Sequence, residues 1–268
     1  LLNLPECDYF ITAGYGKLLP VECLNAPRLA ALNIHFSLLP KYRGANPAEW
    51  ALLAGEKESG VSVIEMSPTF DTGAITAQSK IAMQDTENRE TLYKKLYTLA
   101  GNIVGEVITA DYSWRQAKTI PTNTQNISFS YPPEDQEPSP TPYARKLTKD
   151  DSWISEQALQ TALGMHTHTI IASDLSPFLW EQWQEWQKNH GSFASFLETA
   201  TRALYGFPGL WTLVATSKGE KRLKIHTAFL QKKSTEQAPE AQLVLENVQL
   251  EGQQVAQWNQ VKNAISWA

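Results

Sequence analysis

One short stretch, Asn33-Ile34-His35-Phe36-Ser37-Leu38-Leu39-Pro40, carries the strongest signal for the fold. The apolar residues 32–36 predict a buried strand, and the serine, leucines and proline after it predict a loop. Asn33 and His35 are two positions apart, and alternate side chains of a strand point to the same face. We therefore expect the amide and the imidazole to converge on one cleft.

A carboxylate follows the next apolar run of the chain. Residues 61–66 predict a second strand, and the chain then reaches Asp71-Thr72-Gly73. The loop of residues 67–70 allows the Asp71 carboxylate to fold back towards the His35 imidazole. A carboxylate near a histidine favours the imidazolium form, which is the better hydrogen-bond donor at neutral pH.

These three groups suit the transfer of a formyl group onto an amine. Attack of an amine on a formyl carbon places negative charge on the formyl oxygen, so the site needs hydrogen-bond donors and a relay for the amine proton. Asn33 and His35 are the candidate donors, with Asp71 beside them. A single histidine next to a strand is more often structural than catalytic, so the assignment depends on the rest of the pattern.

The rest of the pattern resembles a known family. Asn-x-His-x-Ser-Leu-Leu-Pro-x-x-Arg-Gly, with Asp-Thr-Gly downstream, is similar to the signature of the folate-dependent formyltransferases. Within that superfamily, Arg43-Gly44-Ala45-Asn46-Pro47 resembles the methionyl-tRNA formyltransferases. The resemblance covers roughly residues 9–147 and resumes near residues 203–229.

The resemblance implies that Asn33, His35 and Asp71 are catalytic, that 10-formyltetrahydrofolate is the formyl donor and that no metal takes part. Tetrahydrofolate would pack against Ser37, Leu38, Leu39 and Pro40. The pterin would border a second loop, which contains Gly14, Tyr15, Gly16 and Leu18. The alternative for these glycines is a tight strand-to-helix turn without ligand contact.

The acceptor implied by the resemblance is initiator methionyl-tRNA, used in translation initiation. Candidate acceptor-binding residues are Arg43, Lys218, Lys221, Arg222 and Lys224, with Lys232 and Lys233 nearby. Arg43 either orients the acceptor or holds its own loop through backbone carbonyls. The lysines either contact phosphates or protect a solvated hairpin edge from aggregation. Two other functions stay open: a formyltransferase for an amino sugar nucleotide, and a non-catalytic RNA-binding remnant.

Length and composition fit an ordinary non-membrane protein. The 268 residues predict about two domains, with a net charge of −5. No apolar run approaches the ~20 residues that a spanning helix needs. Cys7 and Cys23 lack metal-ligand spacing, which favours a reduced, cytoplasmic setting. His166 and His168 have no third candidate ligand nearby, so we expect no zinc site there. We expect a monomer.

Alternating strand and helix signals indicate an α/β, Rossmann-like formyltransferase catalytic domain over residues 1–120. Asn46 is suited to cap a helix over Pro47–Ala54 that stops at Gly55. A longer helix begins near residues 86–89. Its apolar stripe is Leu92, Leu96, Leu99, Ile103 and Val107.

The chain starts at Leu1, shortly before the strand-like residues 9–12. A doubly wound sheet needs more strands than precede Asn33, and the family carries a further strand-and-helix region there. We therefore expect an N-terminally truncated chain whose catalytic domain is incomplete, so that retained catalytic residues need not mean retained activity.

Residues 121–142 contain six prolines and predict a linker without regular structure. Residues 143–268 are expected to form a C-terminal domain with a Trp-rich insertion at 152–200. Alternation in residues 210–216, 223–229, 243–245 and 248–250 predicts a small antiparallel β domain, which the resemblance makes an oligonucleotide-binding (OB-like) barrel. Trp180, Trp183 and Trp186 lie three apart on an expected helix, where a packed face is more common than an RNA-stacking platform.

Overall fold

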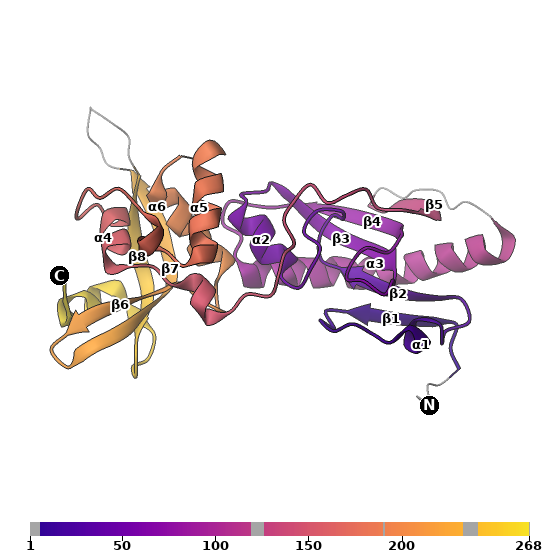
Figure 1. Ribbon diagram of the computed structural model, residues 1–268, viewed down its shortest axis with the longest axis horizontal. Helices are drawn as coiled ribbons and strands as arrows, with labels where there is room; N and C mark the ends of the chain where they lie inside the picture. Colours follow the sequence, from indigo (N-terminus) through magenta and orange to yellow (C-terminus); the bar gives the residue numbers. More distant parts are fainter. Residues whose placement is uncertain (1–5, 119–125, 190, 233–240, 268) are drawn as a thin grey trace. The chain divides into compact units, whose positions relative to one another are not determined.

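The computed structural model describes residues 6–118, 126–189, 191–232 and 241–267, which are coloured in Figure 1. The chain divides into two compact units. The first consists of Leu1–Ala51, Glu56–Asp85 and Thr91–Lys146, and the second of Leu52–Gly55, Thr86–Glu90 and Leu147–Ala268. Within these described residues, each unit has its own five-stranded sheet.

The sheet of the first unit is mixed and has the order β1-β2-β3-β4-β5. Its strands are β1 (Tyr9–Ala13), β2 (Ala30–His35), β3 (Glu58–Glu65), β4 (Ile75–Ala82) and β5 (Ser128–Glu134). β1 and β2 are parallel, whereas the remaining neighbours are antiparallel. Because β1 and β2 are parallel and Ala13 pairs with Ile34, the C-terminal ends of these two strands lie next to each other. The α/β class expected from the sequence is confirmed.

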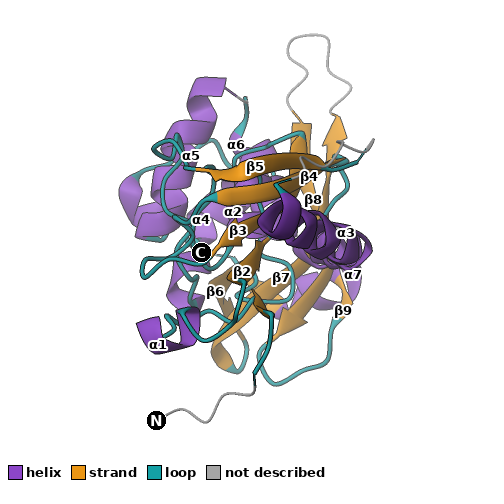
Figure 2. Ribbon diagram, turned by 90° about the vertical axis from the view of Figure 1, so that its right-hand side faces the viewer, coloured by secondary structure: helices purple, strands orange, loops and turns teal. Residues whose placement is uncertain are grey.

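The first unit contains the helix α1 (Val21–Leu24) and most of α2 (Pro47–Leu53) and α3 (Arg89–Ala117). Figure 2 shows α3 beside the β2, β3 and β4 strands. The Asn46 side chain donates to Glu49 inside the first turn of α2, and Gly55, with a φ of 69°, follows the end of that helix. Both expected helices are therefore present, and α2 ends one residue earlier than predicted.

The apolar stripe of α3 differs from the prediction at one position. Leu92, Leu96, Ile103 and Val107 are buried, but Leu99 is only half-buried. Ala100 is buried instead. The buried positions 92, 96, 100, 103 and 107 are three or four residues apart, and this spacing keeps them on one face of the helix.

A polar network fastens the end of α3 to two strands. The Tyr9 hydroxyl donates to Asp111 at 2.8 Å, and Arg115 Nε donates to the same carboxylate oxygen at 2.6 Å. Arg115 also pairs with Glu65 of β3. Asp111 is fully buried, and its pairing with Arg115 offsets the cost of burying the carboxylate.

The proline-rich segment is partly a strand. The prediction of no regular structure is wrong for β5, which contains Pro132 and Pro133 and pairs with β4 across an irregular register. Proline is tolerated at a sheet edge, where a missing N–H breaks no ladder, and β4 is the one neighbour of β5 among the described strands. Residues 135–142 form neither helix nor strand, and Pro121 lies outside the described residues.

The sheet of the second unit is antiparallel, in the order β10-β6-β7-β8-β9. Its strands are β6 (Trp211–Thr216), β7 (Gly219–Lys232), β8 (Ala241–Leu250), β9 (Ala256–Gln257) and β10 (Ile265–Ser266). The two segments predicted at 243–245 and 248–250 are parts of the single strand β8. The expected antiparallel domain is present, while its closure into an OB-like barrel stays a prediction.

The helices of the second unit are α4 (Glu156–Ala162), α5 (Pro177–Asn189), α6 (Phe193–Ala203) and α7 (Trp258–Val261), with short 3₁₀ turns at Lys149–Ser152, Ala172–Asp174 and Lys262–Ala264. On α5, Trp183 and Trp186 are buried, with ring centroids 5.5 and 6.0 Å from that of Phe196. The expected packed face is thus confirmed for these two, and Trp180 is half-buried. Among the described helices, none combines the length and apolar character needed to cross a bilayer.

We expect Leu96→Ala to lower the free energy of unfolding of the first unit by about 2–5 kcal/mol, the usual cost of such a core truncation. The matched change Leu99→Ala should cost clearly less, because Leu99 is only half-buried. Urea titration of both variants tests this difference. Equal losses would mean that α3 packs through a different face.

Candidate active site

The three residues predicted to be catalytic lie together in the first unit. Asn33 and His35 end β2, and Asp71 belongs to the loop between β3 and β4. Asp71 Oδ1 is 3.3 Å from Asn33 Nδ2 and 3.5 Å from His35 Nδ1. The side chains of His35 and Asp71 are only 6% and 10% exposed. One carboxylate oxygen therefore faces both an amide and an imidazole in a nearly dry environment.

The backbone of Asp71 has an unusual conformation. Its φ is 54°, in the left-handed region that non-glycine residues seldom occupy. The carboxylate is held by the Gly44 N–H, which donates to Oδ2 at 2.9 Å. The main-chain carbonyl is held by Gln136 Nε2, also at 2.9 Å. At Gly73, a Cβ atom would collide with the Glu65 carbonyl, so the end of this loop requires glycine.

The surroundings of His35 favour its neutral form. Burial lowers its pKa, and the Asp71 carboxylate and the Tyr42 carbonyl offset this only in part. His35 Nε2 lies 2.9 Å from the Tyr42 carbonyl oxygen, which can only accept, so we assign the proton to Nε2 and leave Nδ1 facing Asp71. The expectation of an imidazolium is wrong because loss of hydration outweighs the carboxylate's attraction.

The Asn33 amide is oriented by a residue that the sequence did not single out. Thr12 Oγ1 donates to Asn33 Oδ1 at 2.8 Å, which turns Nδ2 towards Asp71. Thr12 and Asn33 are paired across the parallel strands β1 and β2. The sequence does show a polar side chain, Thr12, near the end of an apolar strand. Its contact with Asn33, however, can be inferred only once the register of β1 and β2 is known.

The loop expected to bind folate is supported from the strands beneath it. The Ser62 hydroxyl donates to the Ser37 carbonyl at 2.7 Å and accepts from the Leu39 N–H at 3.0 Å. Gln78 Nε2 donates to the Leu39 carbonyl at 2.9 Å. Ser37 and Leu39 are buried, whereas Leu38 and Pro40 are half-buried. The conformation of this loop thus follows from β3 and β4.

The second loop expected near the pterin begins where β1 ends. Gly14 and Gly16 have φ values of 63° and 69°, so both use the left-handed conformation that glycine allows. Tyr15 and Leu18 are each 55% exposed. The register of β1 and β2 starts this loop at the sheet edge that carries His35.

Of the two roles considered for Arg43, its contacts are those of a loop-holding residue. Arg43 Nε donates to Gln136 Oε1 at 3.0 Å, and a terminal nitrogen donates to the Glu137 carbonyl at 2.9 Å. Gln136 was missed by sequence reasoning because it lies 93 positions from Arg43, inside the proline-rich segment.

The basic residues of β7 do not share one face. Lys221 lies on the same face of the strand as the buried Leu223, whereas Arg222 and Lys224 lie on the opposite face. The Arg222 guanidinium carbon lies 4.4 Å from the Trp211 ring centroid, and Lys224 Nζ donates to the Gly206 carbonyl at 2.8 Å. Burial lowers the Lys224 pKa, and nearby Lys149 adds to this effect. Lys218 and Lys232 are exposed, and Lys233 lies outside the described residues.

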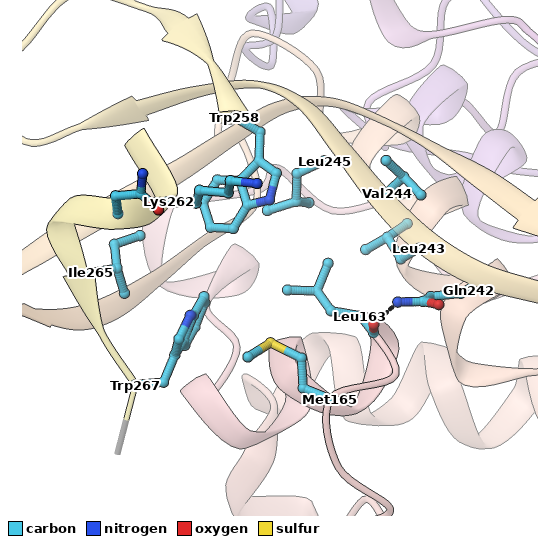
Figure 3. A pocket seen from close by; sticks show the side chains of 11 residues that line it. Leu163, Met165, Gln242, Leu243, Val244, Leu245, Trp258, Lys262, Ile265 and Trp267 are labelled. Atoms are coloured by element: carbon cyan, nitrogen blue, oxygen red, sulfur yellow. Dashed lines mark hydrogen bonds between the residues drawn. The ribbon is translucent and has the colours of Figure 1, made fainter. Parts of the chain in front are cut away.

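The second unit contains an open groove of about 680 Å³, shown in Figure 3. Its lining is mainly apolar and includes Met165 and the tryptophans Trp258 and Trp267, whose ring centroids are 6.2 Å apart. Lys262 is the charged side chain of the lining, which holds no carboxylate or imidazole. The groove therefore lacks the groups of an acid–base site.

No group of three or more candidate metal ligands occurs among the described residues. His168 Nε2 lies 2.9 Å from Asp174 Oδ2. The same carboxylate also accepts hydrogen bonds from the Ile171 N–H and the Ser155 hydroxyl. These bonds, opposed by burial, lower the Asp174 pKa.

Comparison with known proteins finds matches to part of this chain. Residues 2–108 match the family model described as formyl transferase. The curated proteins to which the chain is similar include methionyl-tRNA formyltransferases. That of Staphylococcus epidermidis is 32% identical over 220 residues, which are 82% of this chain and 63% of the relative. That of Mycoplasmopsis pulmonis is 46% identical over 100 residues, 37% of this chain and 35% of the relative. The chain thus spans less than two thirds of these relatives.

Two solved structures have a similar fold. HypX from Aquifex aeolicus, in complex with tetrahydrofolic acid, has a TM-score of 0.55 at 15% identity and covers 95% of this chain and 38% of its own. An N-formyltransferase from Helicobacter canadensis, in complex with folinic acid and dTDP-3-aminofucose, has a TM-score of 0.50 at 17% identity. The match covers 84% of this chain and 62% of the Helicobacter chain. At these identities the likeness concerns the fold alone.

We expect His35 to make the first unit less stable in acid. Its pKa is below the ordinary value of 6.5, so between these two values the unfolded chain binds more protons than the folded one, and stability rises with pH. Unfolding free energies at pH 7 and pH 5 should therefore differ more in the wild type than in His35→Gln. An identical pH dependence in wild type and His35→Gln would contradict the assignment of a neutral His35.

Proposed function

We propose that this chain carries the catalytic site of an enzyme that transfers the formyl group of 10-formyltetrahydrofolate to the α-amine of initiator methionyl-tRNA. The observation that carries the proposal is the Asp71 carboxylate facing both the Asn33 amide and the His35 imidazole. The similarity to methionyl-tRNA formyltransferases supports the choice of acceptor.

The site has a division of labour that suits this transfer. The Asn33 Nδ2 carries two hydrogens, one directed to Asp71, and the other can stabilise the charge that develops on the formyl oxygen. The unprotonated Nδ1 of His35, next to Asp71, can hold the proton that the attacking amine releases. A new carbon–nitrogen bond then replaces the bond between the formyl carbon and the folate nitrogen, and the proton passes to that departing nitrogen.

The folate supplies the activated formyl group. We place it against the loop of Ser37, Leu38, Leu39 and Pro40, with the pterin towards Gly14, Tyr15, Gly16 and Leu18. Two features support this placement. The first loop follows β2, which carries Asn33 and His35, and the second follows β1, which ends beside it. The second loop also offers exposed backbone at its glycines. Tyr15 adds an exposed aromatic face suited to a flat ring.

For the acceptor, we propose that the antiparallel sheet of the second unit is an OB-like, tRNA-binding barrel. Arg222 stacked on Trp211 pairs a cation with an aromatic ring, a combination that suits nucleic acid. Lys218 is exposed in the neighbouring turn and can reach a phosphate. We assign Arg43, Lys221 and Lys224 lesser roles, because each has a structural contact or a different face. The reaction would take place in the cytoplasm, on a monomer.

The trio should be needed for turnover. Asn33→Ala removes a donor to the formyl oxygen, and loss of one such donor typically costs about 10² to 10³ in kcat. Asp71→Asn should also slow the reaction, because the His35–Asp71 pair can no longer share a proton. Lys57→Ala, an exposed change in the same unit, is the control. Transfer at the wild-type rate in either trio variant, with circular dichroism unchanged, would refute the assignment.

The acceptor can be identified by the salt dependence of binding. Methionyl-tRNA binding should weaken steeply with added salt, because phosphate contacts release counterions. Lys218→Glu combined with Arg222→Glu should reduce the slope of log K against log salt by about one per lost contact. The pair Lys57→Glu and Lys80→Glu, exposed in the first unit, controls for net charge. Formylation of an amino sugar nucleotide without labelling of charged tRNA would establish the other acceptor class.

A further inference from the structure

The Gln136 side chain connects three segments that are distant in the sequence. Its Nε2 donates to the main-chain carbonyls of Asp71 and Gly73, at 2.9 and 2.7 Å. Its Oε1 accepts from Arg43 Nε at 3.0 Å. Both donor hydrogens and the acceptor of this amide are therefore used.

These bonds close a ring around the proposed catalytic carboxylate. Arg43 precedes Gly44 directly, and the Gly44 N–H holds Asp71 Oδ2. The ring thus runs from Asp71 through Gln136 and Arg43 to Gly44, and back to Asp71. It fixes both the backbone and the side chain of a residue with a φ of 54°, a conformation that persists only where its surroundings impose it.

We propose that Gln136 is a positioning residue that locks the Asp71 carboxylate against Asn33 and His35. The inference rests on the proposed function, because the carboxylate's placement matters for formyl transfer. Gln136 lies behind Asp71, on its main-chain side. Its hydrogen bonds go to Arg43, Asp71 and Gly73 and not to Asn33 or His35, so it acts on the site through the Asp71 loop.

The chemistry at this position requires a primary amide of this length. Glutamate would still accept from Arg43, but it would set carboxylate oxygens against two carbonyl oxygens. Asparagine is one methylene shorter and cannot reach both sides at once. Gln136→Glu is therefore the sharpest variant, because it keeps the Arg43 contact and the side-chain size while it removes both donations to the Asp71 loop.

The first test measures formyl transfer by wild type, Gln136→Glu, Gln136→Ala and the control Glu137→Gln. We expect kcat to fall about 10²-fold in both Gln136 variants, the effect of misplacing a reacting group by about 1 Å. The KM for the formyl donor and the thermal unfolding midpoint should stay near wild type. Glu137→Gln should behave like wild type, since Arg43 contacts only the main chain of Glu137. Unchanged kcat in both variants, or a kcat loss matched by loss of the fold, would overturn the proposal.

The second test does not depend on turnover. Histidine ring resonances in ¹⁵N-labelled protein report the His35 titration, with His35→Gln used for assignment. Asp71 raises the His35 pKa against the effect of burial, so releasing the carboxylate should lower that pKa further in Gln136→Ala, which adds no charge of its own. The His226 titration should not move, because His226 lies in the second unit. An unmoved His35 titration would overturn the proposal even if kcat fell.

The two tests separate this proposal from the proposed function. If the wild type formylates no amine while the His35 titration shifts as expected, the positioning role stands and the proposed reaction fails. If the wild type formylates methionyl-tRNA while the titration and kcat of the Gln136 variants are unchanged, the reaction stands and the positioning role fails.

Discussion

The site depends on holding one carboxylate in a backbone conformation that it would not adopt alone. Asp71 is in the left-handed region, and its two polar ends are fixed by the Gly44 N–H and the Gln136 amide. Its remaining oxygen then faces Asn33 and His35. Three segments contribute to this placement. The loop of residues 66–74 contains Asp71, the loop of residues 36–46 supplies the Gly44 N–H, and the segment of residues 135–142 supplies the Gln136 amide.

The need for such a conformation follows from the direction of β3. Because β3 is antiparallel to β2, Ser62 lies opposite His35, and Glu65 lies opposite Leu32. The chain therefore leaves β3 towards the start of β2, away from the end that carries His35, and its loop has to fold back before Asp71 can reach His35. A left-handed residue, together with the crowded Gly73, reverses the chain in few residues. A parallel β3 would have ended at the site and needed no such turn.

Local signals were enough to predict that Asn33, His35 and Asp71 lie together, but not the protonation of His35. Strand alternation placed Asn33 and His35, and the loop after β3 brought Asp71 to them. The charge of His35 depends on burial by distant segments, which a short motif does not record, and the prediction failed there. Thr12 and Gln136 escaped notice for the same reason: their bonds to Asn33, Arg43 and Asp71 join separate parts of the sequence. The prolines of β5 were misjudged because their tolerance depends on an edge position in the sheet.

The distribution of contacts separates the chemistry from the choice of acceptor. The partners that hold the trio, namely Thr12, Tyr42, Gly44 and Gln136, belong to the first unit, as the trio does. The arginine and tryptophan proposed to meet nucleic acid belong to the second. Substitutions at Lys218 and Arg222 should consequently alter acceptor binding while the geometry around Asp71 is unchanged. Under the proposed function, an amine acceptor of another class could then replace tRNA by changes in the second unit, because the contacts that hold Asp71 lie in the first unit.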